Sequence, residues 1–228
     1  MRSAVLALVA IALLAPGSSQ AAGFKPWAAA SGSWATYSMK DVNDQIGSIN
    51  QTLAGSGLSM DEINNGFGFG VAFGGDLNDA LSVGVGYDRV FGSSDVSDAS
   101  GGIKFDFPAN AYRGFGEYRF PSTGQFKPHL GISLGMISTS GNVELSAAGS
   151  PTDKSKVEGS GPLAEAYVGG DMWASPQFAI LGSVGYRYAK VSEFKVAGET
   201  ATNADGSKAT MDYSGFNARL GIKFAFGK

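Results

Sequence analysis

Bulky apolar residues alternate strictly with small residues along residues 67–91. Phenylalanine and valine alternate with glycine and alanine, and the alternation resumes after a polar break at residues 75–79. Successive side chains leave a pleated backbone on opposite sides, so the pattern predicts strands with one apolar face and one nearly bare face. The polar break has turn chemistry. We therefore expect an antiparallel hairpin with its turn near Leu77, in which Phe69 lies opposite Val85.

The same alternation recurs along the chain, and long and short connections follow one another without exception. This wiring predicts an all-β fold, an eight-stranded antiparallel up-and-down barrel with both chain ends beside the short turns. The first strand alternates weakly, so either Trp27 and Tyr37 or Trp34 faces outward. Residues 92–102, 138–161 and 192–209 are expected to form polar loops. The expected strands are residues 27–37, 67–74, 81–88, 104–120, 126–136, 162–174, 178–188 and 216–226.

One stretch has helical rather than strand periodicity. Apolar residues separated by four, three and four positions form a single stripe, and either Ser38 or Asp41 could cap the start. The pattern predicts a short amphipathic helix in the first long connection. Its apolar face needs cover, and the glycines on the bare strand faces leave room near the rim, so we expect the helix to cap the barrel mouth. The stripe consists of Val42, Ile46, Ile49 and Leu53, with Ile46 and Ile49 directed toward the mouth.

The apolar faces of the predicted strands must be shielded from water, and a membrane would shield them. The 228 residues include 34 Gly and 15 Phe, and the mean hydropathy is +0.00 because every second strand residue is small or polar. A water-soluble barrel of the lipocalin type would instead point the apolar face inward. The bare second face, with charges only at mid-strand, and the tyrosines near strand ends favour the transmembrane barrel.

The first 22 residues have the pattern of a secretory signal peptide. Arg2 precedes an apolar run at residues 5–15, and small residues surround a cleavage point after Ala21 or Ala22. Residues 23–228 would then form one barrel domain. The chain has no Cys, so its stability does not depend on disulfides. A net charge of −3 gives no electrostatic case for binding nucleic acid.

The signal peptide, alternating strands, wiring and aromatic closing strand together resemble the small outer-membrane β-barrel superfamily, which includes the OmpA-type transmembrane domain and the OmpX- and Opa-like proteins. The resemblance implies short turns in the periplasm and long loops outside the cell. It also implies a monomer surrounded by outer-membrane lipid and lipopolysaccharide. Such proteins usually end in an aromatic residue that the barrel-assembly machinery recognises. This chain departs from that pattern because Gly227 and Lys228 follow Phe226, and we expect Phe226 to be the equivalent residue.

Charged residues on the bare face would lie inside the barrel, where charges must be paired. With turns at Pro176 and Thr123, Glu165 is expected opposite Arg187, and Glu117 opposite His129. We interpret these charges as a structural polar network that fills the lumen. The expected network consists of Arg113, Glu117, His129, Glu165, Asp171, Arg187 and Arg219.

No residue pattern predicts catalysis or a cofactor. The one histidine, His129, follows a short turn, whereas outer-membrane lipid enzymes and proteases use histidine at the outer rim. One His and no Cys leave a histidine-rich or thiolate metal site unsupported. We expect a structural or surface-interaction protein that acts through its long loops. The alternatives are a narrow channel or transporter for small or apolar molecules and, ranked lower, a lipid-modifying enzyme.

Overall fold

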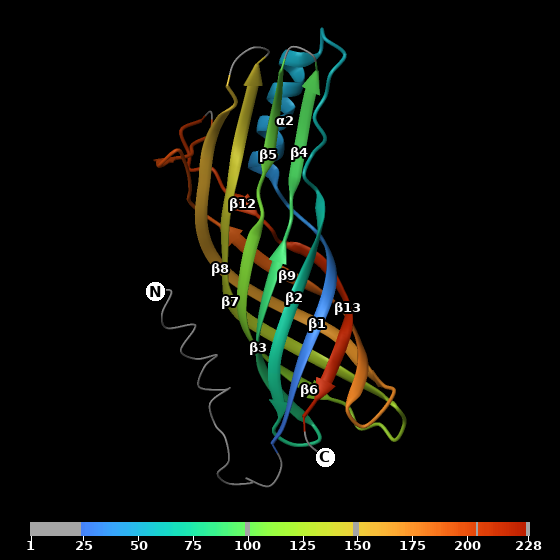
Figure 1. Cartoon of the computed structure of the whole chain (residues 1–228). Helices are drawn as coiled ribbons and strands as arrows, with labels where there is room; N and C mark the ends of the chain where they lie inside the picture. The colour runs from blue at the N-terminus through green and yellow to red at the C-terminus, as the bar shows by residue number, and fades with distance from the viewer. Residues whose placement is uncertain (1–23, 99–100, 148–150, 204, 227–228) are drawn as a thin grey trace.

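The computed structural model describes residues 24–98, 101–147, 151–203 and 205–226, and most of its regular structure is antiparallel sheet (Figure 1). Eight strands form a ring: each pairs with the next along the chain, and the last pairs with the first. The predicted eight-stranded up-and-down barrel is confirmed. The signal peptide expected at residues 1–22 lies outside the described residues. The barrel strands are β1 (Lys25–Thr36), β2 (Asn65–Asp76), β3 (Leu81–Val90), β6 (Ala109–Arg119), β7 (Phe126–Ala147), β8 (Asp153–Trp173), β9 (Phe178–Val191) and β13 (Gly215–Ala225).

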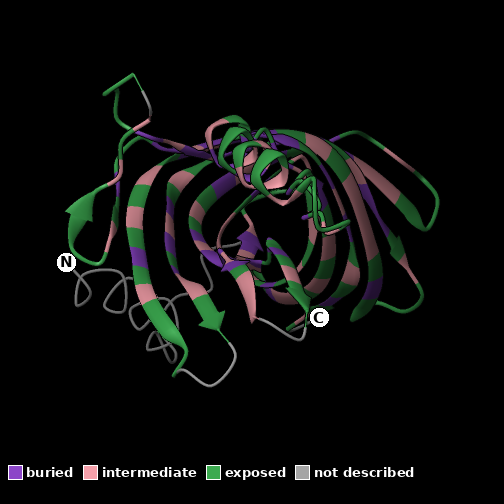
Figure 2. Cartoon of the chain, turned by 90° about the horizontal axis from the view of Figure 1, so that it is seen from above, coloured by how far each residue is buried: buried purple, intermediate pink, exposed green. Residues whose placement is uncertain are grey.

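The two ends of the barrel differ. Residues 77–80, 120–125 and 174–177 make short turns at one end, beside the start of β1 and the end of β13; we call this the turn end. The opposite loop end carries the predicted helix and several short strands, and from above the helix lies over one side of the opening (Figure 2). No helix among the described residues is both long and apolar enough to cross a membrane. The elements at the loop end are α2 (Lys40–Leu53), β4 (Ser93–Asp98), β5 (Gly101–Asp106), β10 (Phe194–Val196), β11 (Glu199–Thr200) and β12 (Met211–Asp212).

Three connections expected as polar loops contain β-structure instead. β7 and β8 continue past the barrel as one long hairpin, β5 and β4 extend it on one side, and β10 and β11 extend it on the other. We call these six strands the loop-end sheet. Its outward face is polar, and Lys104, Glu144 and Lys154 form a row across three strands. No lipid covers the outer face of these strands, so their outward residues are not apolar. The alternation that revealed the barrel strands is therefore missing here.

The exposed large apolar side chains of the ring form a belt on its outer face. A continuous exposed apolar surface of this extent is typical of a membrane-embedded protein. Aromatic residues concentrate near both edges of the belt, as expected where side chains meet membrane interfaces. They are Phe24, Tyr118, Phe120, Phe126, Phe178, Phe224 and Phe226 toward the turn end, and Trp34, Phe67, Phe91, Tyr112, Tyr186, Tyr188 and Phe216 toward the loop end.

The structure settles which face of the first strand points outward. Trp34 is 40% exposed and lies in the outer belt, whereas Trp27 and Tyr37 are buried inside. The Trp27 indole nitrogen donates to Ser82 and to Asp76. An inward indole needs such a partner, which explains why the tryptophan at this position can point into the lumen.

The register of the first hairpin differs from the prediction by four residues. Phe69 pairs with Arg89, and Val85 pairs with Phe73. The turn lies further along the chain because the Asn78 side-chain oxygen accepts hydrogen bonds from the backbone N–H groups two and three residues later. A shift by an even number of residues leaves every side chain on its predicted face.

The bare strand faces do not leave the lumen empty. A Cβ atom on Gly84 would come 2.5 Å from the Phe115 ring, and one on Gly131 would come 2.3 Å from the Tyr167 ring. These glycines therefore make room for aromatic rings that extend from neighbouring strands across the inner wall. The expected space near the rim is likewise filled, since Asp88 lies against Gly70.

Candidate functional site

Glu165 on β8 is at the centre of an inward-facing polar network. Its carboxylate accepts two parallel hydrogen bonds from the Arg219 guanidinium of β13, one of them at 2.9 Å between Nη2 and Oε2. Asn217 Nδ2 donates to Glu165 Oε1 at 3.1 Å. A bidentate arginine–carboxylate pair is among the strongest polar contacts in proteins, and here both partners are buried. This pair holds β8 and β13 together across the lumen.

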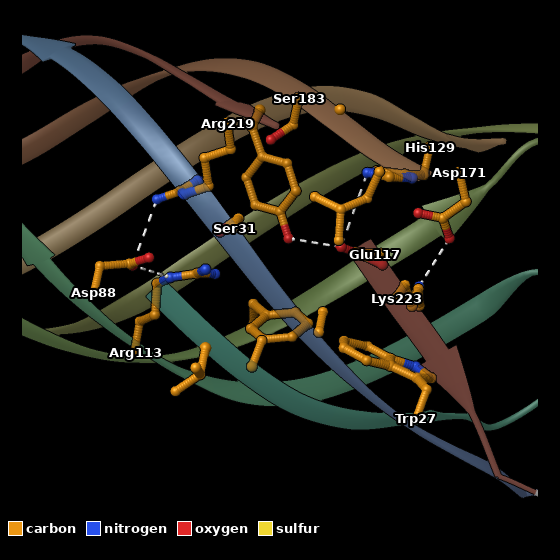
Figure 3. Close-up of a pocket in the computed structure, with 17 residues that line it drawn as sticks. Trp27, Ser31, Asp88, Arg113, Glu117, His129, Asp171, Ser183, Arg219 and Lys223 are labelled. Carbon is orange, nitrogen blue, oxygen red and sulfur yellow. Dashed lines mark hydrogen bonds and ion pairs between the residues drawn. The ribbon is translucent and has the colours of Figure 1, made fainter. Parts of the chain in front are cut away.

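Asp88 on β3 extends this network to the opposite side of the barrel. Arg113 Nε donates to Asp88 Oδ2 at 2.8 Å, and Arg219 Nη2 lies 3.6 Å from the same oxygen (Figure 3). Asp88 was not part of the expected network, although the alternation along β3 already assigned it to the inward face. Two arginines and two carboxylates from four strands thus meet in one layer.

The expected pairing of Glu165 with Arg187 is wrong, although the register that suggested it is right. The two residues are cross-strand neighbours. Arg187 is only 2% exposed, and its Nε donates to the Tyr213 carbonyl oxygen at 3.3 Å. In a narrow barrel inward side chains converge on the axis, so a carboxylate can reach a partner two strands away. Glu165 pairs with Arg219 for this reason.

A second layer lies toward the turn end. The Tyr167 hydroxyl donates to Glu117 Oε1 at 3.1 Å, and His129 Nε2 lies 3.9 Å from the same oxygen. The register places Arg119, not Glu117, opposite His129. The expected contact between Glu117 and His129 nevertheless forms, because the two side chains meet one row apart inside the lumen.

A third layer closes the turn end. Lys223 Nζ donates to Asp171 Oδ2 at 2.8 Å and lies 4.1 Å from the centre of the Trp27 ring. Arg119 and Asp76 form a further pair at 2.5 Å. Sequence analysis placed Asp76 in a turn and Arg119 outside the network. We call the three layers together the lumen network: Asp76, Asp88, Arg113, Glu117, Arg119, His129, Glu165, Tyr167, Asp171, Asn217, Arg219 and Lys223.

The centre of the lumen network encloses a small cavity. This cavity has a volume of about 60 Å³. Glu117 and His129 line it, and Glu117 Oε2 and His129 Nδ1 are buried without a protein hydrogen-bond partner. A polar cavity of this size accommodates a few water molecules, and these would bind such atoms. It is too small for a solute to pass through without rearrangement of the side chains.

Above the lumen network, the loop end is filled by apolar residues. Val42 and Ile46 of α2 are buried in this cluster, Ile49 packs against it, and Leu53 at the end of the stripe is half-exposed. The helix therefore uses the first three positions of its apolar face to cover the barrel mouth. We call these residues the mouth cluster: Ala35, Tyr37, Met39, Val42, Ile46, Met60, Ile63, Val90, Phe105, Phe107, Ala109, Ala111, Ile137, Val157, Leu163, Ala189, Val191, Phe194, Ala209, Met211 and Tyr213.

Sequence analysis missed the rest of the mouth cluster. Ile137, Leu163 and Val191 occupy inward positions on three barrel strands. Leu163 lies on the face predicted to be small or polar, whereas Ile137 and Val191 lie just beyond the predicted strand ends. Inward apolar residues restricted to the loop ends of strands were the available signal. The Tyr213 hydroxyl, buried at the centre, donates to the Phe107 carbonyl oxygen at 3.0 Å and so satisfies its polar atom.

Polar contacts fix α2 over the mouth at both of its ends. Asp41 Oδ2 accepts hydrogen bonds from the Thr210 backbone N–H at 2.8 Å and from the Thr210 hydroxyl at 2.9 Å, and Asn203 also donates to it. Toward the other end, the Asn50 side chain exchanges two hydrogen bonds with the backbone of Met60. Neither Ser38 nor Asp41 caps the helix, because Met39 occupies that position without a side-chain cap.

The contacts of Asp41 shift its ionisation. Burial raises the pKa of this carboxyl, but the hydrogen bonds from Thr210 and Asn203 outweigh burial and hold the pKa below its ordinary value. A lowered pKa in the folded state stabilises the docked helix above the ordinary value of about 4. This stabilisation is lost as the pH falls through the folded-state pKa.

The chain is similar to known proteins in its fold and not in its sequence. No protein-family profile matches the chain, and no curated protein matches its sequence. Among solved structures, that of Neisserial surface protein A is similar, with a TM-score of 0.50 and 17% identity over 90% of this chain and 98% of that one. The chain has the fold of a small outer-membrane β-barrel. At this level of identity the similarity shows the fold alone.

Two further solved structures are similar over most of the chain. The outer membrane protein OprG from Pseudomonas aeruginosa has a TM-score of 0.48 and 13% identity, over 91% of this chain and 97% of that one. The attachment invasion locus protein Ail of Yersinia pestis, solved with the heparin analogue sucrose octasulfate, has a TM-score of 0.46 and 13% identity, over 89% of this chain and 99% of that one.

Proposed function

We propose that the chain is an outer-membrane protein that acts at the cell surface through its loop end, and that its barrel is an anchor rather than a channel. The observation that carries this proposal is the closure of the lumen. The central part of the lumen network encloses a cavity of about 60 Å³. The mouth cluster covers it, and Ile46 of α2 is completely buried there. The lumen network and the mouth cluster, one charged and one apolar, both lie between the two ends of the barrel.

The loop-end sheet is the part of the molecule suited to contact a partner outside the cell. Its inner face carries Ile103 and Val143, which pack against the mouth cluster, so the sheet is supported from within. Its outer face bears charged residues, including the pair Lys154–Glu144 at 2.7 Å. A sheet held on one face and polar on the other can present a fixed surface to the environment.

Export and assembly complete the proposal. The signal peptide at residues 1–22 would direct export and be removed, and the barrel-assembly machinery would insert residues 23–228. Phe226, exposed at the turn end, is the aromatic residue we assign to recognition by that machinery. In the membrane the protein would be a monomer with lipid and lipopolysaccharide around its apolar belt. The turn end would face the periplasm and the loop end would face the outside of the cell.

We assign no catalytic, metal or cofactor role to the lumen. His129 is the single histidine of the chain, and it is buried three residues into β7, near the turn end. A lipid substrate in the outer leaflet would have no access to it. Within the described part of the chain, no three His, Cys, Asp or Glu side chains are grouped closely enough to hold a metal ion.

Planar-bilayer conductance tests the closed lumen. The parent protein should give no stepwise current above the bilayer background. Ile46→Asp should also give none, because releasing α2 opens only the mouth and leaves the lumen network in place. Regular ion-selective steps from the parent protein would contradict the proposal and favour the narrow channel instead.

A further inference from the structure

Arg89 lies on the outward face of the barrel, near the loop end of β3. It pairs in register with Phe69 of β2 and Asn110 of β6, all within the aromatic edge of the apolar belt. Its guanidinium carbon lies 5.5 Å from the centre of the Phe91 ring. A charged side chain at this height contacts the membrane interface rather than the acyl-chain region. It is therefore placed at the level of the outer-leaflet headgroups.

The charge of Arg89 lacks the kind of partner that the arginines of the lumen network have. Each of Arg113, Arg119 and Arg219 forms an ion pair with a carboxylate, whereas the buried Arg187 donates to a backbone carbonyl. Across the described ranges, no carboxylate lies within ion-pair distance of Arg89. The adjacent Asp88 points into the lumen, because successive strand residues face opposite sides. The outward charge of Arg89 can therefore pair with an anion outside the protein.

The guanidinium is held in position from one side. Nη1 donates to Asn110 Oδ1 at 3.1 Å, and the Tyr87 hydroxyl donates to the same oxygen at 2.8 Å. The Tyr87 ring in turn packs against Tyr112, with ring centres 5.4 Å apart. These contacts orient Arg89 but engage only one of its nitrogens by a hydrogen bond among the described residues. Nε and Nη2 make no hydrogen bond within the described ranges.

We propose that Arg89 binds a phosphate group of the phosphorylated glycolipid in the outer leaflet; this rests on the outer-membrane placement proposed above. A planar guanidinium matches two phosphate oxygens at once and is the preferred side chain for this recognition. The lipid source is favoured over a soluble anion because the exposed Phe69 ring lies beside Arg89 in register, and the exposed Val83 of the same strand continues the apolar belt toward the turn end. One molecule can contact this apolar surface with its chains and the arginine with its headgroup.

Native mass spectrometry of the full chain released from phosphatidylcholine nanodiscs can test the proposal, with lipid A and dephosphorylated lipid A as probes. The parent should retain lipid A, and Arg89→Gln should weaken this binding about tenfold or more, since charged hydrogen bonds are lost. Arg89→Lys should fall between them. Binding of dephosphorylated lipid A should be weak and equal in all three. The matched control is Lys208→Gln, which alters an exposed loop lysine paired with Glu193 and should bind like the parent.

Asn110→Asp gives a second route that keeps the arginine. It places a carboxylate against the guanidinium and should weaken lipid A binding while the barrel still shows heat-modifiable migration. Equal lipid A binding by the parent, Arg89→Gln and Asn110→Asp would overturn the proposal. Inorganic phosphate that displaced lipid A at equal concentration would also overturn it in favour of a soluble anion. Failure of the parent to enter nanodiscs would instead count against the membrane placement itself.

Discussion

Replacing Glu165 by leucine should lower the free energy of unfolding by about 3–5 kcal/mol, one of the largest effects expected for any single change. The substitution removes both hydrogen bonds that Arg219 makes with the carboxylate, and leaves Asn217 Nδ2 without its acceptor. A buried guanidinium that loses its main partner retains its full desolvation penalty. Urea unfolding in lipid vesicles, followed by tryptophan fluorescence, measures the change.

A double-mutant cycle identifies the partner. Glu165→Leu combined with Arg219→Leu should recover much of the lost stability, because neither charge is then buried alone. The matched cycle uses Arg187→Leu, since Arg187 is the register neighbour of Glu165 but donates to Tyr213 instead. A stronger coupling of Glu165 to Arg187 than to Arg219 would show that the lumen network is assigned wrongly.

Ile46→Asp should release α2 from the barrel mouth while the strands stay folded. The substitution puts a carboxylate at a completely buried position in the mouth cluster, where it has no partner. In reconstituted parent protein, hydrogen exchange should be slow from Asp41 to Leu53; in the variant these amides should exchange as fast as an open loop does. The control is Leu53→Asp, which changes the half-exposed end of the same stripe and should keep the protection.

Acidification should loosen the same helix without mutation. The hydrogen bonds to the Asp41 carboxylate lower its pKa, so they stabilise docking above about pH 4 and are lost as the pH falls through the folded-state pKa. Asp41→Asn should remove this pH dependence. If the wild-type segment already exchanges at neutral pH like an undocked loop, the helix does not cover the mouth.

The sequence predicted the barrel well because a strand that crosses the membrane alternates apolar outward residues with small or polar inward residues. Within the apolar belt, the residue type therefore indicates which face a side chain lies on: Phe69 points outward and Asp88 points inward. That rule gave the number and order of the strands and part of the inward set of charges, while Asp76, Asp88 and Arg119 were left out of the expected network. It failed at the loop end, where β7 and β8 continue into water and Glu144 and Lys154 occupy the outward face.

The pairing of the inward charges could not be read from the sequence. Alternation assigns a face, and turn residues assign a register, but neither specifies contacts across the lumen. The register placed Glu165 opposite Arg187 correctly, yet the carboxylate binds Arg219 from two strands away. The mouth cluster was missed for a related reason: Met60 and Met211 lie in connecting segments without periodicity, so only the helical stripe of α2 indicated apolar packing there.

Single-cysteine labelling tests most directly the central claim that the chain spans the outer membrane with α2 and the loop-end sheet outside. The parent has no Cys, so a membrane-impermeant maleimide reports only the introduced residue. Lys154→Cys should be labelled on intact cells, and Thr123→Cys, in a turn at the other end, only after the outer membrane is disrupted. Leu134→Cys, in the apolar belt, should react only in the denatured protein. Labelling of all three in a detergent-free soluble fraction would contradict the account.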